Sequence, residues 1–160
     1  MTRHGLVAGL LVLAAGAGCG YAVGSGTVRL PVGAERVFVP PLENRTVDAE
    51  AGALVAAALR EELSRRGVAG GEGAPASIEG VVTRSSSSPL TTQSGTWRLV
   101  FEVQARLTVN GREAAQVKVR REVDYLGEVD AIATEGRRRL AIRRAAEEAA
   151  REIVERLETP

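Results

Sequence analysis

TWRLVFEVQARLTVNGREAAQVKVRREVDY, residues 96–125, is the stretch that decides the fold of this 160-residue chain. In its first half the odd positions are apolar and the even positions mostly polar, which is the period of two that a half-buried β-strand requires. Asn110 and Gly111 then tolerate the positive φ angles of a tight turn. A second strand follows, with Val117, Val119, Val123 and Tyr125 on one face. The stretch therefore predicts a β-hairpin with one apolar face that other parts of the chain must cover.

The register of this hairpin follows from the side chains that it places opposite one another. A two-residue Asn-Gly turn would put Val103 opposite Lys118 and mix the apolar and polar faces. A three-residue loop, Asn110-Gly111-Arg112, keeps each face uniform, so we predict that loop. The pairs that it sets are Ala105 with Val117, Val103 with Val119, Leu99 with Val123, Trp97 with Tyr125, Arg98 with Asp124 and Glu102 with Arg120. Directly opposed pairs contribute about 0.2–1 kcal/mol each, and a slip of one residue would lose all of them.

Length and composition indicate one domain with a core of aliphatic side chains. Only 3% of the residues are aromatic, so Val, Leu, Ile and Ala must form that core. The formal net charge is +1, and removing Arg3 from the 21 basic residues leaves them equal in number to the 20 acidic ones. A neutral chain is a poor candidate for general nucleic-acid binding, which depends on neutralising phosphates with Lys and Arg.

The chain has one cysteine, Cys19, and one histidine, His4. One cysteine excludes an intramolecular disulfide, and no cluster of Cys and His has the spacing of a metal site. Since His4 lies in a segment that we expect to be removed, the mature protein would have no imidazole base for catalysis. We therefore expect neither a catalytic residue nor a metal or other bound cofactor.

Residues 1–18 have the pattern of a bacterial lipoprotein signal peptide. A basic start precedes an apolar run from Leu6 to Ala15, which has the proportions of a secretory segment and is short for a membrane span. Small residues then lead to Cys19, whose thiol would take diacylglycerol and whose new amino group would be acylated. Gly16 stands where a lipobox usually has Leu, so an ordinary signal peptide or an uncleaved anchor is the alternative. Acyl chains contribute ~0.8 kcal/mol per buried CH₂, so several of them would attach the protein permanently.

The residue after the cysteine is Gly20 rather than Asp, which in typical lipoproteins implies export to the outer membrane. Residues 19–34 then form the predicted lipid anchor and a tether that is rich in Gly, Ser and Pro.

The rest of the chain supplies elements that cover the hairpin. Apolar residues at spacings of three and four predict helices over residues 48–66 and 128–157. Short apolar runs predict strands over residues 35–40 and 77–83, whereas residues 42–46, 68–76 and the serine-rich 84–95 are expected to be loops or links. A strand, a helix and a strand in this order predict a parallel crossover. Residues 35–160 should thus form one α+β domain, a four-stranded mixed sheet in the order β-α-β-β-β-α with two helices packed on one face.

Cations without an opposing acid gather near the tip of the hairpin. Two arginines of its polar face pair with acids in the predicted register, which leaves Arg106 and Lys118 unpaired, with Arg112 in the turn. Such cations could meet phosphate groups, Arg through bidentate hydrogen bonds and Lys as a point charge. The alternative is that they only prevent edge-to-edge aggregation of sheets. Arg121, opposite Phe101 on the apolar face, has no explanation in the sequence other than a bulge or a contact with a partner.

Several motifs, in this order along the chain, resemble the LptE family of lipoproteins, which assemble lipopolysaccharide at the outer membrane together with the LptD β-barrel. The matching residues are Cys19-Gly20-Tyr21, Leu30-Pro31, Val37-Phe38-Val39-Pro40, Glu43-Asn44-Arg45-Thr46 and, in the last helix, Arg137, Ala141, Ala145, Ala146, Ile153, Val154 and Leu157. The resemblance implies the same sheet and helices, no catalytic activity, a plug for the LptD barrel that aids its folding, and lipopolysaccharide binding through basic residues near the hairpin. Lys118 lies on the strand where the family places a basic residue. The expected lipopolysaccharide site is therefore Arg106, Lys118, Arg112 and Arg120.

A second family of envelope lipoproteins has a similar opening. Regulators of peptidoglycan synthases of the LpoB kind also have a lipid anchor, a Val-x-Val-Pro-Pro-x-x-Asn strand exit and a helix. They would have a longer disordered tether than residues 20–34, so they rank second. An enzyme ranks last, because the mature chain would lack a histidine, a free cysteine and a convergent pair of acids. We expect a lipid-anchored protein at the periplasmic face of the outer membrane, with a β-barrel and lipopolysaccharide as its partners.

Overall fold

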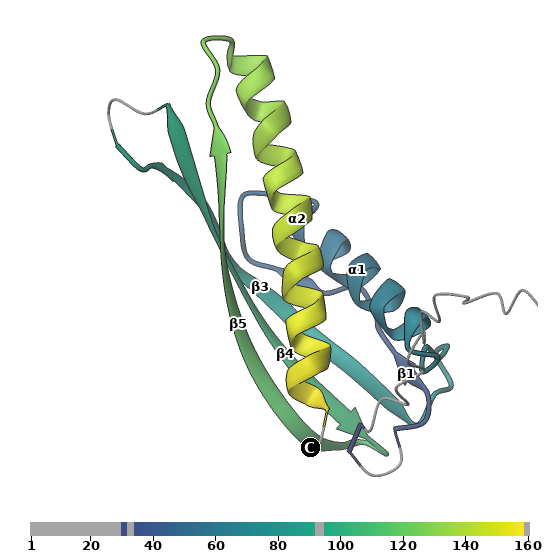
Figure 1. Cartoon of the computed structure of the whole chain (residues 1–160). Coiled ribbons are helices and arrows are strands. Elements are labelled where there is room, and N and C mark those ends of the chain that lie inside the picture. Colours follow the sequence, from purple (N-terminus) through teal and green to yellow (C-terminus); the bar gives the residue numbers. More distant parts are fainter. Residues whose placement is uncertain (1–29, 32–33, 92–94, 159–160) are drawn as a thin grey trace, which may run out of the picture.

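The structure, a computed structural model, describes residues 30–31, 34–91 and 95–158. The predicted signal peptide, the predicted lipidation site Cys19 and most of the predicted tether lie outside these residues. Figure 1 shows two layers, a twisted β-sheet and two helices that lie on the same face of it. None of the helices in the described ranges combines the length and apolar character needed to cross a bilayer.

The elements follow one another in the order β-β-α-β-β-β-α. Their bounds are β1 Val37–Phe38, β2 Glu43–Asn44, α1 Ala51–Arg65, β3 Ala76–Pro89, β4 Thr96–Val109, β5 Arg112–Leu126 and α2 Ala131–Leu157. The sheet order is β1-β3-β4-β5, and the two short strands β1 and β2 both pair in parallel with the same strand, β3. The other neighbours are antiparallel. This arrangement confirms the predicted α+β class, the mixed sheet and the parallel crossover through α1.

The predicted pairing of the long hairpin is confirmed, but the predicted three-residue loop is wrong. Every predicted pair, from Ala105 with Val117 to Trp97 with Tyr125, is present between β4 and β5. The turn consists only of Asn110 and Gly111, with φ angles of 50° and 77°, because Arg112 already pairs with Val109. A β-bulge next to the turn supplies the missing residue. Leu107 pairs with Ala115 and Thr108 with Glu113, which leaves Ala114 as the extra residue on β5.

Two segments that were expected to be loops belong to the sheet. The serine run lies in β3, where Ser85 pairs with Phe101 and Ser87 with Leu99. The first part of β4 carries apolar side chains on its inner face. Pairing with β4 therefore outweighs the weak preference of serine for strands. The expected loop over residues 42–46 likewise contains β2, which pairs with Val81 and Val82 of β3.

Both helices begin about three residues later than predicted. The helix expected over residues 48–66 is α1, and the helix expected over residues 128–157 is α2, whose N-cap residue is Asp130. The Asp130 carboxylate accepts a hydrogen bond of 2.9 Å from the backbone N–H of Ile132, which satisfies one of the free donors of the first turn. The core between the layers is aliphatic apart from Phe101 and Tyr125 on the sheet. Helix α2 packs against β5 and β4, and α1 packs beside α2.

Candidate interaction surfaces

The outer side of the sheet, which we call the polar sheet face, is covered by neither helix (Figure 1). Alternation along the strands places polar side chains there and apolar ones toward the helices. Its charged members on β3, β4 and β5 include five cations, Arg84, Arg98, Arg106, Lys118 and Arg120, and five acids, Glu79, Glu102, Glu113, Glu122 and Asp124. The face is therefore strongly charged but close to neutral.

At the end of the hairpin away from the turn, Arg98 and Asp124 form a two-pronged ion pair. Nε and Nη2 of Arg98 donate to the two carboxylate oxygens of Asp124 at 2.7 and 2.9 Å. These hydrogen bonds hold the pKa of Asp124 below its ordinary value and raise the pKa of Arg98. The pair matches the register predicted from the sequence and leaves little net charge at this end of the face.

Glu102 is the centre of the polar sheet face. Its side chain is only 15% exposed, and three cations surround it: Arg120 at 3.0 Å, Lys118 at 3.8 Å and Arg84 at 4.0 Å. Arg120 also donates to Glu122 at 2.9 Å, and this hydrogen bond raises the pKa of Arg120. The predicted pair of Glu102 with Arg120 is thus confirmed. Lys118 shares one carboxylate with two arginines at the longer distance of 3.8 Å, so its charge is only partly compensated.

The prediction that Arg106 has no acidic partner is wrong. Its Nη2 donates to Oε2 of Glu79 on β3 at 2.8 Å, which raises the pKa of Arg106. The two residues are direct cross-strand neighbours. They line a hollow of 490 Å³ that Pro40, Pro41 and Arg45 also border. The sequence of the hairpin alone does not reveal Glu79 as a partner, because Glu79 lies on a third strand, β3.

Of the four residues expected to bind lipopolysaccharide, the structure leaves two with exposed, weakly compensated charges. Arg112 at the turn is exposed, and no ion pair to it occurs within the described part of the chain. Lys118 is on the same strand, with a side chain that is 62% exposed. Arg106 and Arg120 lie on the same face but are each held by an acid within 3.0 Å. Arg112 is opposite the buried Val109 and so lies on the helix side of the hairpin tip, whereas Lys118 lies on the polar sheet face. An anion could therefore meet either residue without displacing a carboxylate held within 3.0 Å.

Arg121, which the sequence left unexplained, is neither bulged nor free. It pairs with Phe101, as expected, and its Nη2 forms an ion pair with Oε2 of Glu152 on α2. Glu152 also pairs with Arg156, whose Nη1 donates to the backbone oxygen of Lys118 at 3.0 Å. This cluster joins the edge strand β5 to the last turns of α2. Its role is therefore structural.

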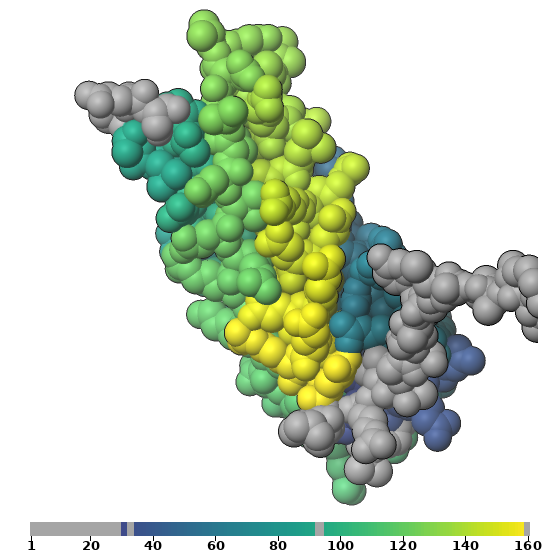
Figure 2. All heavy atoms as spheres, in the orientation of Figure 1, coloured from purple at the N-terminus to yellow at the C-terminus, as the bar shows by residue number. Residues whose placement is uncertain are grey.

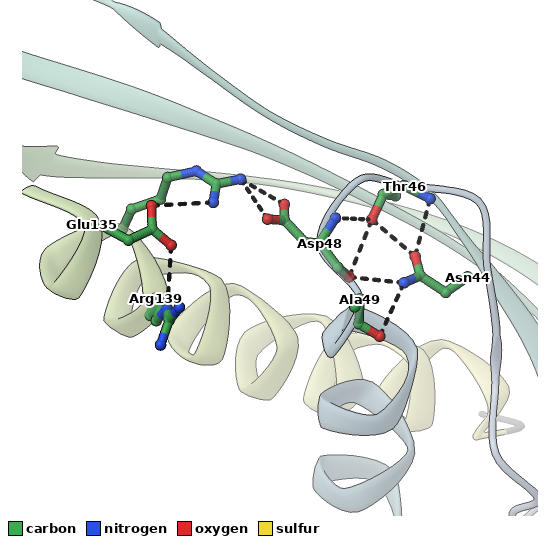
Figure 3. A network of polar contacts seen from close by, with 7 residues as sticks. Asn44, Thr46, Asp48, Ala49, Glu135 and Arg139 are labelled. Atoms are coloured by element: carbon green, nitrogen blue, oxygen red, sulfur yellow. Dashed lines mark hydrogen bonds and ion pairs between the residues drawn. The ribbon is translucent and has the colours of Figure 1, made fainter. Parts of the chain in front are cut away.

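A second polar network joins the loop before α1 to α2 (Figure 3). The Asn44 side chain accepts hydrogen bonds from the backbone N–H and hydroxyl of Thr46 at 3.1 and 2.8 Å, and it donates to the backbone oxygen of Asp48 at 2.8 Å. The Asp48 carboxylate in turn accepts from Arg138 of α2 at 2.6 and 2.7 Å. Burial acts to lower the pKa of Arg138, but the hydrogen bonds and charge of Asp48 outweigh it and leave the pKa raised. The Glu43-Asn44-Arg45-Thr46 motif thus forms a turn that positions the two helices.

Most of the charged side chains in the described ranges take part in ion pairs. Within those ranges no group of three or more His, Cys, Asp or Glu side chains is placed to hold a metal ion. What this arrangement can do chemically is present complementary charges and hydrogen bonds to a partner.

Solved structures define the class of this domain. A lipoprotein from Caulobacter crescentus CB15 is similar over 73% of this chain and 87% of its own, with a TM-score of 0.56 and 23% identity. Rare lipoprotein B from Shewanella oneidensis is similar over 75% of this chain and 92% of its own, with a TM-score of 0.55 and 20% identity. The PelC dodecamer subunit from Paraburkholderia phytofirmans is similar over 78% of this chain and 87% of its own, with a TM-score of 0.55 and 17% identity. At these identities the likeness shows a shared two-layer α+β fold.

The sequence of the folded domain identifies the protein family. The model of the LptE lipopolysaccharide-assembly family matches residues 34–157, and the chain therefore belongs to that family. Membership makes it a non-catalytic lipoprotein of lipopolysaccharide assembly, so the predicted family and the expectation that the chain is not an enzyme are confirmed. No curated protein has a matching sequence.

Proposed function

We propose that this protein is anchored to the periplasmic face of the outer membrane through acyl chains on Cys19, plugs an LptD-like β-barrel and supports its assembly, and binds lipopolysaccharide in transit to the outer leaflet. Membership of the LptE family supports the general role. The barrel, the glycolipid contact and the anchor are the specific parts of the proposal, and each has its own physical support and test.

The polar sheet face is the observation that supports the proposed role as a plug of a β-barrel. The interior of a large outer-membrane barrel is polar, so a partner inside it must present polar and charged groups rather than an apolar surface. The polar sheet face does so over three long strands, and its ion pairs keep the net charge close to zero. Internal compensation means that few charges lose water without a partner when the face is covered.

Contact with lipopolysaccharide rests on Arg112 and Lys118. The phosphates of its lipid portion would meet Arg112 through two parallel hydrogen bonds and Lys118 as a point charge. Arg106 and Arg120 would serve as secondary contacts, since an incoming phosphate would have to share them with Glu79 and Glu102.

Recovery of the partner from membranes tests the plug. The full chain, tagged at its C-terminus, would be purified in mild detergent from outer membranes of its own bacterium, and co-purifying proteins would be identified by mass spectrometry. We expect an outer-membrane β-barrel at a constant ratio to the tagged chain. Consistent recovery of a peptidoglycan synthase in its place would refute the plug and favour a regulator of the LpoB kind.

The mass of the N-terminal peptide tests the anchor, because lipidation adds acyl chains to Cys19. An unmodified thiol at Cys19 would contradict the proposed anchor.

Charge reversal tests the glycolipid site separately. The variant carrying Arg112→Glu and Lys118→Glu should lose most of its affinity for purified lipopolysaccharide, with little change in the unfolding midpoint because both side chains are exposed. Arg151→Glu, on an exposed arginine of α2 with no ion pair in the described ranges, is the matched control. Equal loss of affinity in the control would show a general charge effect, and unchanged binding in the double variant would remove the site assignment.

A further inference from the structure

We propose that the first half of α2 is an interface through which two copies of this chain associate, antiparallel and about a two-fold axis at Gly136. This inference is independent of the proposed barrel and glycolipid contacts. It rests on an apolar stripe and on the separation of charges along the helix.

The apolar stripe consists of Ile132, Gly136 and Leu140, which are spaced four residues apart and so lie along one side of the helix. Ile132 is 83% exposed and Leu140 is 65% exposed. Figure 2 shows that the upper half of α2 extends beyond α1, with one side open to solvent. Large apolar side chains that line up on an open helix surface indicate a contact site rather than scattered surface residues.

Gly136 is the centre of the stripe. A glycine in an exposed helix interior costs about 1 kcal/mol relative to alanine. Its own molecule gives no reason for it, since a Cβ atom built at Gly136 would meet no heavy atom of the described chain within 4 Å. The absence of a side chain does allow the backbone of another helix to approach closely at this point.

Charges around Gly136 are separated by sign. The segment from Gly127 to Glu135 contains only acidic charges, at Glu128, Asp130 and Glu135, and the segment 137–144 contains only basic ones, at Arg137, Arg138, Arg139, Arg143 and Arg144. Two antiparallel copies that cross at Gly136 would set the acidic segment of each against the basic segment of the other. A parallel pair would place like charges side by side, so the charges select the antiparallel arrangement.

The crossing also brings the individual side chains into suitable positions. Ile132 of one copy lies opposite Leu140 of the other, on both sides of the axis. Arg143, exposed and without an ion pair within the described residues, comes level with Glu128 and Asp130 of the second copy. Glu128 is ion-paired with Arg137 of its own copy at 2.6 Å, so Arg143 would share that carboxylate across the axis. The Arg139–Glu135 pair, already 3.2 Å within one copy, comes beside its symmetry mate. A second copy would therefore cover the apolar stripe, pack closely against Gly136 and provide an acidic neighbour for Arg143.

The interface is small. Residues 128–144 span roughly 25 Å at 1.5 Å per residue, and the contact is only one helix wide. The area buried on each copy is therefore below the standard of about 800 Å² per partner. Association should therefore be weak and reversible, and a covalent trap is the suitable assay.

Cysteine cross-linking of the full chain tests the inference. With Cys19→Ser as background the chain has no other thiol, and Gly136→Cys places one thiol per copy at the proposed axis, where two Cα atoms can approach within the roughly 4.4–6.8 Å that a disulfide requires. Glu155→Cys, on the same helix with a side chain that is 55% exposed, is the matched control. Mild oxidation in non-ionic detergent should cross-link position 136 several-fold faster than position 155.

Charge exchange makes the result specific. Arg143→Glu in the Gly136→Cys background should slow cross-linking about fivefold, because two symmetry-related contacts become repulsive at once. Adding Glu128→Arg should restore the rate, since it returns an opposite charge across the axis. Equal rates at positions 136 and 155, or no effect of Arg143→Glu, would overturn the proposal.

Discussion

Two glycines, one in each helix, should respond to the same substitution with opposite signs. A methyl group added at Gly52, near the start of α1, would lie 2.5 Å from the backbone oxygen of Leu42 and 3.3 Å from Cβ of Asn44. Gly52 is buried, and the loop that it touches is held by the hydrogen bonds of Asn44. A methyl group added at Gly136 meets no heavy atom of residues 30–31, 34–91 and 95–158 within 4 Å. The two positions thus share the helical backbone and differ in their surroundings.

The magnitudes follow from two competing terms. Alanine in place of glycine gains about 0.5–1 kcal/mol in a helix interior, because glycine loses more backbone entropy on folding. At Gly136 this gain is uncompensated, so Gly136→Ala should stabilise the protein by that amount. At Gly52 the methyl group must push α1 away from a backbone carbonyl, and overpacking of this kind costs typically 1–3 kcal/mol. Gly52→Ala should therefore have a net cost of about 1–2 kcal/mol.

Urea denaturation of both variants, followed by far-ultraviolet circular dichroism, measures the effect. Equal m-values would show that the midpoints report stability alone. In thermal unfolding the variants should move in opposite directions, by about 3–5 °C per kcal/mol for a body of this size. If Gly52→Ala stabilised the protein as much as Gly136→Ala, the close contact between α1 and the Leu42 carbonyl would be refuted.

Three further predictions concern the polar groups. Glu152→Ala should cost about 1–3 kcal/mol in urea because it leaves the Arg121 guanidinium under α2 without its carboxylate, and adding Arg121→Leu should recover part of that loss. Ser85→Ala should leave stability unchanged or raise it by up to about 1 kcal/mol, since the buried Ser85 hydroxyl has no hydrogen-bond partner among the residues that the structure describes. The carboxyl of Asp124 should titrate below its ordinary pKa in an NMR titration, and Arg98→Gln should move it back up. The lowered pKa means that the stabilising effect of Arg98 is complete above the unfolded-state pKa of about 3.9 and is lost as pH falls through the folded value.

Much of the fold could be predicted because one hairpin carries two independent signals. Its apolar alternation fixes which face is buried, and its opposed charges fix the register. Both signals give the correct residue pairs even when the predicted turn length is wrong, because the register depends on the sum of the turn residues and the bulged residue. A two-residue turn with one bulged residue gives the same pairs as the three-residue loop. Pairing by itself does not distinguish these two solutions, so the bulge at Ala114 was missed.

The serine run shows why the third strand was harder to predict. Four consecutive serines have no apolar alternation, and serine favours turns over strands. The strand forms because β4 continues beyond the point where β3 was expected to end, and the free edge of β4 pairs with whatever backbone is adjacent. Register along β3 also shifts by one residue between Val82 and Arg84. A bulge of this kind changes which side chains face the helices, and only the neighbouring strand determines it.

The candidate site has the same dependence on neighbours. Within the hairpin, opposed residues could be paired from the sequence, and the Arg98–Asp124 and Arg120–Glu102 pairs are both present. Arg106 was wrongly expected to have no ion-pair partner because that partner, Glu79, lies on β3. The register of β3 could not be predicted without knowing its bulge. A cation on a central strand has neighbours on both sides, whereas one at the turn or on the edge strand has fewer. Lys118 was also expected to be unpaired, but it lies 3.8 Å from Glu102 of the same hairpin and shares that carboxylate with Arg120 and Arg84. The expected anion contact therefore moves from Arg106 on the central strand to Arg112 and Lys118 on the edge strand β5, and of these two only Arg112 has no ion pair within the described residues.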